Sequence, residues 1–481
     1  MAQQLRDKVA SGVAWSAAEK VGSMLLQMVV SIVVARLLVP EDFGVLAILT
    51  FFTALMAVVV DSGFSQTLIR KSNPTNDDYK SVFIFNIAIS VALYIIMVLA
   101  SPAIASYYEL PIIRRIAPVL LLLLPLNALC VIQNTIFARQ FRFATLSRIN
   151  FTSSAVSGAI AIGMALCGCG VWSLVGQRLA QMATKALLLW WRGEWRCEGT
   201  FSRKALADMG SFSFRLMGTD IISYLYNNIA QLFIGKIYSA STLGYFNQAQ
   251  KLKELPVTAV VQSFQSVTYP ALSNVKDNSE KFADSYRRVL MITAAVICPI
   301  MVGMIAVAED MFMLLLGPRW MDTVPYFKIL SLAGLFYPLS MIAYNILKVG
   351  GNGKLILRLE IIKKTIMTLI LAIAIPHSVI AIAWGLTVMA AVELALNTVF
   401  SLRFARLSIA QLVKTLLPIA ILSASMYCIV TLSTEYLLYR LSLPLRFTLQ
   451  VVLGATVYTL CGAVLKMEFF KEIYHTIKRM F

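Results

Sequence analysis

Charged residues inside long apolar stretches are the candidates for chemistry in this sequence. A charge at the middle of a bilayer costs roughly 2.5–3.5 kcal/mol even on a lenient scale, so such residues usually bind substrate, gate or couple ions. The first half of the chain places Lys20, Asp61, Arg178 and Lys185 in this way, and the second half places Arg215, Asp220, Lys251, Lys253, Glu254 and Glu393. Basic residues outnumber acidic ones in this set, which favours the binding of an anion.

These residues predict two kinds of site. The substrate-binding set is Arg178, Lys185, Arg215, Asn227, Gln231, Lys251, Lys253 and Gln27, and the gate or ion-coupling set is Lys20, Asp220, Asp61 and Glu254. Arg178, Gln181 and Lys185 are three and four residues apart, so they share one helical face. A phosphate in a site of low dielectric constant would form strong charge-assisted bonds there. The alternative is that Lys185 and Arg215 extend to the membrane interface.

A polar stripe runs along residues 210–238, a stretch long enough to cross a bilayer. Asp220, Tyr224, Asn227 and Gln231 recur at steps of four, three and four, so they lie on one helical face. Such a face cannot contact lipid cheaply, and it must face a partner helix or a hydrated space.

The stripe is repeated about 200 residues earlier in the chain. Ser23 matches Ser223, Gln27 matches Asn227, Ser31 matches Gln231, Lys20 matches Asp220, and Phe43-Gly44-Val45 matches Leu243-Gly244-Tyr245. The first helix and the helix at 210–238 are therefore interpreted as copies of each other, with opposite charges at one position.

Composition places these helices in a membrane. The 481 residues are 59% hydrophobic and 14% charged, with a mean hydropathy of +0.77, which predicts an all-α polytopic membrane protein. The net charge of +18 reflects basic loops between spans rather than nucleic-acid binding. The seven cysteines and two histidines form no metal-ligand pattern, and we find no nucleotide-binding or hydrolase motif, so we expect a transporter without a cofactor.

The sequence predicts about fourteen transmembrane helices. Their approximate limits are 11–36, 43–64, 81–101, 116–137, 148–168, 171–192, 209–237, 243–270, 287–308, 325–347, 359–376, 379–400, 412–432 and 445–466. Six spans separate the two copies, so the copies share an orientation and form a parallel repeat about an axis along the membrane normal. The expected organisation is an N-lobe at 1–200 (helices 1–6), a C-lobe at 201–406 (helices 7–12), and two extra helices with a tail at 407–481.

The basic residues also predict the topology. Most Lys and Arg residues fall in alternate short loops, and this asymmetry places both termini in the cytoplasm.

Three segments resemble a known family. They are VVARLLVPEDFG at 33–44, DSGF at 61–64 and GYFNQA at 244–249. With these segments the whole chain resembles the Wzx-type polysaccharide flippases of the multidrug/oligosaccharidyl-lipid/polysaccharide exporter superfamily, near the colanic-acid exporters.

The resemblance implies a multi-pass protein of a bacterial inner membrane. It would move an undecaprenyl-diphosphate-linked oligosaccharide from the cytoplasmic to the periplasmic leaflet by alternating access, for the synthesis of O-antigen, capsule or exopolysaccharide. Its partners would be this polyprenyl-diphosphate-linked oligosaccharide and membrane lipids, and a contact with the polysaccharide polymerase machinery stays open. The family's cavity is typically cationic.

Three other functions are weighed against this one. A multidrug cation antiporter of the same superfamily would use buried carboxylates such as Asp61 or Glu393, but the basic excess opposes it. A lipid II flippase would differ only in its preference for headgroup and tail. A scaffold for glycan enzymes would not need polar stripes within its spans.

The matched positions Lys20 and Asp220 predict an ion pair across the repeat axis near the cytoplasmic end. We expect Lys20→Asp and Asp220→Lys each to abolish transport, and the double swap to restore it because the opposite charges return. Complementation of a strain that lacks the transporter measures this. A swap as inactive as either single variant would reject the pair.

Overall fold

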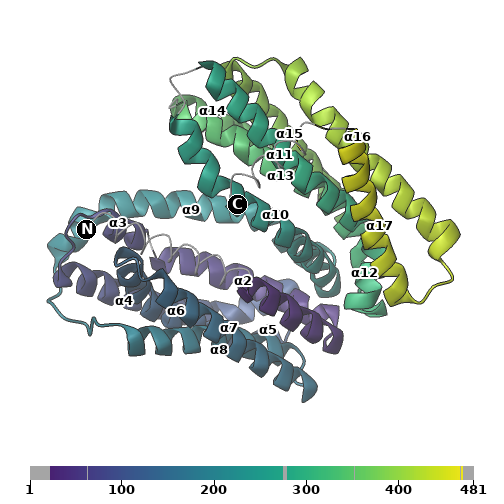
Figure 1. Cartoon of the computed structure of the whole chain (residues 1–481). Coiled ribbons are helices and arrows are strands. Elements are labelled where there is room, and N and C mark those ends of the chain that lie inside the picture. The colour runs from purple at the N-terminus through teal and green to yellow at the C-terminus, as the bar shows by residue number, and fades with distance from the viewer. Residues whose placement is uncertain are drawn as a thin grey trace. The chain divides into compact units, whose positions relative to one another are not determined.

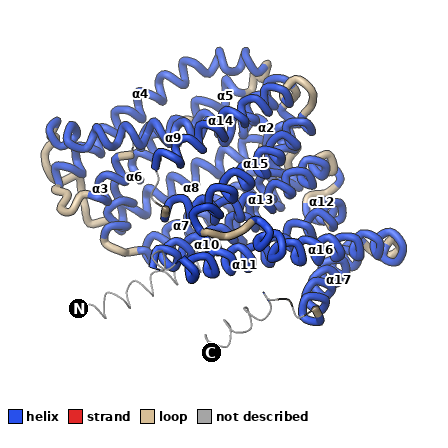
Figure 2. The backbone as a smooth tube through the Cα atoms, turned by 90° about the horizontal axis from the view of Figure 1, so that it is seen from above, coloured by secondary structure: helices blue, strands red, loops and turns tan. Residues whose placement is uncertain are grey.

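The computed structural model describes residues 22–61, 63–274, 279–350, 353–465, 467 and 469, with the backbone alone for 263–274 and for 279. Helices joined by turns and short loops make up this part of the chain, which contains no strand (Figure 2). Contacts divide the chain into two compact units, Met1–Gly244 and Tyr245–Phe481, and each is described by itself. The predicted all-α architecture is confirmed.

Unit 1 holds the helices up to the start of α10 (Figure 1). They are the apolar helix Gly22–Leu37, α2 (Pro40–Asp61), α3 (Phe64–Arg70), α4 (Asn76–Tyr108), α5 (Ile113–Leu120), α6 (Leu123–Arg139), α7 (Phe143–Leu166), α8 (Val171–Arg192) and α9 (Arg203–Ile237), followed by the first residues of α10 (Ala240–Asn274).

Unit 2 holds the rest of the chain. After α10 come α11 (Ser279–Ala306), α12 (Ala308–Leu315), the 3₁₀ turn η1 (Pro318–Trp320), α13 (Thr323–Val349), α14 (Gly353–Ala374), α15 (Val379–Ala405), α16 (Ile409–Ser433), the π turn η2 (Thr434–Leu438) and α17 (Leu443–Val464).

The helices fall on the predicted spans. Nine helices of the described chain are long and apolar enough to cross a membrane. The helices α8, α9, α10 and α14 occupy four of the other predicted intervals but are less apolar or carry more charge, and Gly22–Leu37 covers the described part of the first interval. The protein is therefore a polytopic membrane protein, while the count of fourteen spans stays a prediction.

The sequence repeat and the structural contacts assign the helix α9 to different parts of the protein. The repeat makes α9 the first helix of the predicted C-lobe, whereas its packing against α2, α3 and α4 places it in unit 1. The lobe limits 1–200, 201–406 and 407–481 stay predictions.

The last two helices are attached to unit 2 through one buried carboxylate. Asp310 of α12 is 7% exposed, and the Arg446 guanidinium of α17 donates to both of its oxygens. Gln450 Nε2 donates to Asp310 Oδ2 at 2.8 Å and to Thr434 Oγ1 at 2.9 Å. Asp310 is buried while Arg446 is partly exposed, so breaking the pair would leave the Asp310 carboxylate without a compensating charge. In addition, α16 packs along α11, so α16 and α17 are firmly part of this unit.

The repeated Phe43-Gly44 and Leu243-Gly244 segments meet within unit 1. A Cβ atom at Gly44 would lie 1.7 Å from the carbonyl oxygen of Ala240, and a Cβ at Gly244 would lie 1.9 Å from the carbonyl oxygen of Pro40. The first turns of α2 and α10 thus touch backbone to backbone in a reciprocal way. Only glycine permits this approach, which explains why both copies of the repeat carry it.

We expect Gly44→Ala to destabilise the protein because the added methyl group must push the two helix starts apart. Overpacking of this kind costs typically about 1–3 kcal/mol, so the unfolding temperature in detergent should fall by several degrees. The matched control is Gly163→Ala in α7, where a Cβ would meet nothing within 4 Å. Equal unfolding temperatures for the two variants would contradict the close contact.

Candidate functional site

Three polar side chains from three helices of unit 1 lie together. The amide nitrogens Nε2 of Gln27 and of Gln181 in α8 each lie 3.5 Å from Ser154 Oγ in α7. Ser154 is 5% exposed, while Gln27 is exposed. Hydrogen bonds of this length are weak, so the amides are available to other polar groups.

Arg178 and Lys185 lie one turn before and after Gln181 on the same face of α8. The opposite face carries Leu187 and Trp191, which are 70% and 69% exposed and suit lipid. Arg178 is nevertheless accessible, whereas Lys185 is half-buried. The predicted basic face therefore points toward Gln27 and Ser154, and Arg178 on this face remains exposed.

Two carboxylates of the predicted gate, Asp61 and Asp220, lie in unit 1. Asp61, at the end of α2, is half-buried, and the Ser65 hydroxyl donates to it at 2.5 Å. Asp220 of α9 is near enough to repel its charge. The predicted partner of Asp220, Lys20, lies outside the described residues, so their ion pair stays a prediction. No group of three or more potential metal ligands occurs in the described part of the chain.

Some residues of the polar stripe of α9 make contacts within unit 1, and others are exposed. Tyr224 packs on Phe51 of α2 with ring centroids 5.5 Å apart, and its carbonyl oxygen accepts from Asn228 Nδ2 at 2.9 Å. Gln231 is half-buried, and its Nε2 donates to Asn228 Oδ1 at 3.5 Å. Asn227 and Arg215 are exposed. The stripe therefore contacts α2 through Tyr224, while Asn227 stays accessible.

The predicted residues of α10 in unit 2 lie on different sides of that helix. Lys253 is half-buried, and a Cβ on Gly334 of α13 would lie 3.4 Å from its Cγ, so its stem runs along α13. Lys251 is two residues away, about 200° around the helix, and is exposed. Glu254 is also exposed and accepts from Gln250 Nε2 at 3.1 Å. Whether these residues bind substrate stays a prediction.

A charge cluster in unit 2 surrounds the buried Lys363, which was not predicted, although its member Glu393 was. Lys363 of α14 is 4% exposed, forms an ion pair with Glu360, and places Nζ 5.0 Å from the ring centroid of Tyr344. Lys348 Nζ lies 4.7 Å from the centroid of the same ring. The Glu393 carboxylate of α15 interacts electrostatically with Lys363.

Lys363 lies inside the predicted span 359–376 but was not among the charged residues singled out from the sequence. The helix begins at Gly353, six residues before the predicted start, so Lys363 lies in its third turn. The signal that could have found the cluster is the i, i+3 spacing of Glu360 and Lys363 followed by Glu393 in the next apolar span.

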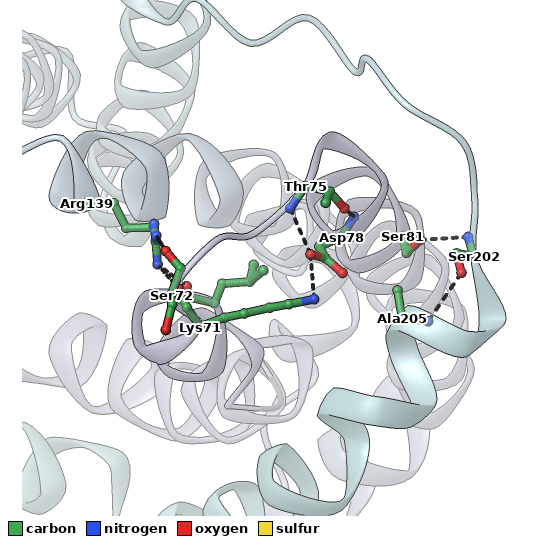
Figure 3. Close-up of polar contacts among 9 residues, drawn as sticks. Lys71, Ser72, Thr75, Asp78, Ser81, Arg139, Ser202 and Ala205 are labelled. Atoms are coloured by element: carbon green, nitrogen blue, oxygen red, sulfur yellow. Dashed lines mark hydrogen bonds and ion pairs between the residues drawn. The ribbon is translucent and has the colours of Figure 1, made fainter.

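Several basic loop residues of unit 1 have structural partners (Figure 3). Lys71 Nζ lies 2.7 Å from Asp78 Oδ2, and Asp78 is 2% exposed and forms a capping box with Thr75 at the start of α4. The Arg139 guanidinium donates to the carbonyl oxygens of Lys71 at 2.7 Å and Ser72 at 3.2 Å. These basic residues stabilise helix ends as well as following the predicted charge asymmetry.

The connection from α8 to α9 is attached to the same end of unit 1. The Ser202 amide donates to Ser81 Oγ at 2.8 Å, and Ser202 Oγ accepts from the Ala205 amide at 3.2 Å, which caps α9 (Figure 3). The start of the striped helix is therefore fixed to α4.

Comparison with known proteins gives a consistent set of relatives. The profile of a family described as "Polysaccharide biosynthesis protein" matches residues 33–325. The teichuronic acid biosynthesis protein TuaB of Bacillus subtilis (strain 168) is 23% identical over 94% of this chain and 94% of its own length. The succinoglycan biosynthesis transport protein ExoT of Rhizobium meliloti (strain 1021) is 24% identical over 72% of this chain and 70% of its own.

A solved structure shares the fold. The lipid II flippase MurJ in an inward closed conformation superposes with a TM-score of 0.77 at 15% identity, over 96% of this chain and 99% of its own. This likeness confirms the predicted class of membrane fold.

We expect Lys363→Met to destabilise unit 2 because it leaves the Glu360 and Glu393 carboxylates without their buried cation. Breaking a fully buried pair typically costs about 3–5 kcal/mol, and the cost here should be smaller because 36% of the Glu360 side chain is exposed, so the unfolding temperature in detergent should fall by a few degrees. Adding Glu393→Gln should recover part of the loss, and Lys354→Met, at the exposed start of α14, is the control. A single variant as stable as the control would contradict the cluster.

Proposed function

The chain belongs to the polysaccharide biosynthesis protein family, and from this premise we propose that it moves a lipid-linked oligosaccharide across a bacterial membrane. The family match covers residues 33–325, and the relative ExoT is named as a transport protein of succinoglycan biosynthesis. The fold shared with MurJ agrees with this proposal. The protein acts as a transporter rather than an enzyme.

The substrate we propose is an undecaprenyl-diphosphate-linked oligosaccharide. The observation that carries this choice is Arg178, an accessible cation on the face of α8 opposite the lipid-exposed Leu187 and Trp191. A diphosphate would form charge-assisted hydrogen bonds with such a group. The weakly bonded amides of Gln27 and Gln181 would donate to sugar hydroxyl groups.

The other predicted binding residues are assigned to the same substrate path. They are Lys185, Arg215, Asn227, Gln231, Lys251 and Lys253. Lys20, Asp220, Asp61 and Glu254 are assigned to gating or ion coupling as two lobes alternate between inward and outward states. The sugar travels along the polar path while the polyprenyl tail stays in lipid.

We place the protein in the inner membrane with both termini in the cytoplasm, as the basic loops indicate. The substrate then moves from the cytoplasmic to the periplasmic leaflet, where the polysaccharide polymerase machinery would receive it.

One observation favours a second function. Asp61 is a half-buried carboxylate at the end of α2 with no ion pair found among the described residues, and together with Asp220 it could bind a cation. A multidrug cation antiporter would use such a pair. Resistance to cationic dyes upon expression, without rescue of a flippase-deficient strain, would support that function instead.

We expect Arg178→Gln to reduce transport by roughly 10–150-fold, the range for losing a hydrogen bond to a charged group worth about 1.5–3 kcal/mol. The measurement is the amount of lipid-linked oligosaccharide that accumulates in a deletion strain carrying the variant. Arg192→Gln, at the exposed end of α8, is the matched control, and immunoblots of membranes verify equal insertion.

Two results would count against the proposal. Full activity of Arg178→Gln would remove the anion site on α8. Accumulation of the peptidoglycan precursor alone in the deletion strain would instead identify lipid II as the substrate.

A further inference from the structure

Unit 2 contains a cavity of about 840 Å³ that the proposed transport does not use. It lies between α11, α16 and the residues that follow α17. Its volume falls within the range of about 300–1,000 Å³ that is typical of small-molecule sites. Met291, Pro418, Ile419, Leu465, Met467 and Phe469 give it an apolar lining.

Charges of both signs line the same cavity. Glu280 and Asp284 come from the first turns of α11, Arg287 from the next turn, and Lys414 from the second turn of α16. Asp284 pairs with Arg287 at 3.4 Å and with Arg288 at 2.8 Å. Glu280 and Lys414 are both exposed, and no ion pair of either is found within the described chain.

The charged and apolar parts of the cavity are arranged by depth. The helices α11 and α16 begin at this end of unit 2 and α17 ends here, and the positive-inside pattern predicts this end to be cytoplasmic. The charges lie on the first turns of α11 and α16, at the level of lipid headgroups. Met291 and Ile419 lie one to two turns deeper, at the level of acyl chains.

We propose that this cavity binds a zwitterionic phospholipid with a primary ammonium group, of the phosphatidylethanolamine type, from the cytoplasmic leaflet. Lys414 contacts the phosphate and Glu280 contacts the ammonium, while an acyl chain fills the apolar lining. A purely anionic headgroup would leave Glu280 without a partner and would be repelled by it, whereas Asp284 is already paired with Arg287 and Arg288. The choice of headgroup thus follows from charge complementarity.

The lipid completes the attachment of the last two helices. At their other end α16 and α17 are fixed through Asp310, Arg446 and Gln450. At this end residues of α11 and α16 both line the cavity, and an acyl chain there adds packing between them. This inference does not depend on the transported substrate.

The test uses the purified full-length protein in detergent after delipidation. Phosphatidylethanolamine, phosphatidylglycerol and phosphatidylcholine are added separately, and the unfolding temperature is followed by tryptophan fluorescence while native mass spectrometry counts bound lipid. We expect phosphatidylethanolamine to raise the unfolding temperature most, since a ligand that binds only the folded state stabilises it.

Variants locate the effect at the cavity. Lys414→Gln and Glu280→Gln should each weaken phosphatidylethanolamine binding by roughly tenfold, as loss of one charged contact does, with Lys354→Gln as the control. Thr415→Trp should block the cavity that Thr415 lines. Leu417→Trp, on an exposed position of the same helix, should leave binding unchanged.

Three outcomes would overturn the proposal. Equal stabilisation by phosphatidylglycerol would show that the headgroup is not selected. Binding that is unaffected by both charge variants would place the lipid elsewhere. Binding that appears only after residues 471–481 are removed would show that the chain's own basic C-terminal segment occupies the cavity.

Discussion

A charge in hydrocarbon must find a partner or water, and this cost decides where polar residues can lie in the protein. Asp310 with Arg446, and Lys363 with Glu360, meet the requirement by pairing within unit 2. Such pairs are weak evidence for function because they satisfy one another. Arg178 differs because it remains exposed, on the face of α8 that it shares with Gln181. This difference, rather than the mere presence of a charge in a span, separates a candidate binding residue from a structural one.

The architecture could be predicted from the sequence because the lipid bilayer requires long apolar helices. Apolar runs of sufficient length and the repeat of polar positions locate the helices, and the fold shared with MurJ confirms the class. The resemblance found in residues 33–44 and 244–249 is confirmed by the family match across 33–325. These segments contain Gly44 and Gly244, whose reciprocal contacts with carbonyl oxygens give a physical reason for the shared pattern.

The candidate site was less predictable because spacing shows which residues share a face but not what that face contacts. Tyr224 was identified as part of a polar stripe, yet its ring packs on Phe51. Lys251 and Lys253 were grouped by proximity in sequence although a helix separates their side chains by more than half a turn. Lys363 was missed because a lysine near an apolar run resembles a loop residue, and only tertiary packing shows that it is buried beside Tyr344.

The glycine contact has a consequence for how relatives of this protein can diverge. Because Gly44 meets Ala240 and Gly244 meets Pro40 through backbone atoms, the joint is insensitive to the identity of surrounding side chains. Residues along the polar faces can change to suit a different glycan without remodelling this junction. Under the proposed function, relatives that carry different surface polymers would vary at the polar faces and keep glycine at both positions of this contact.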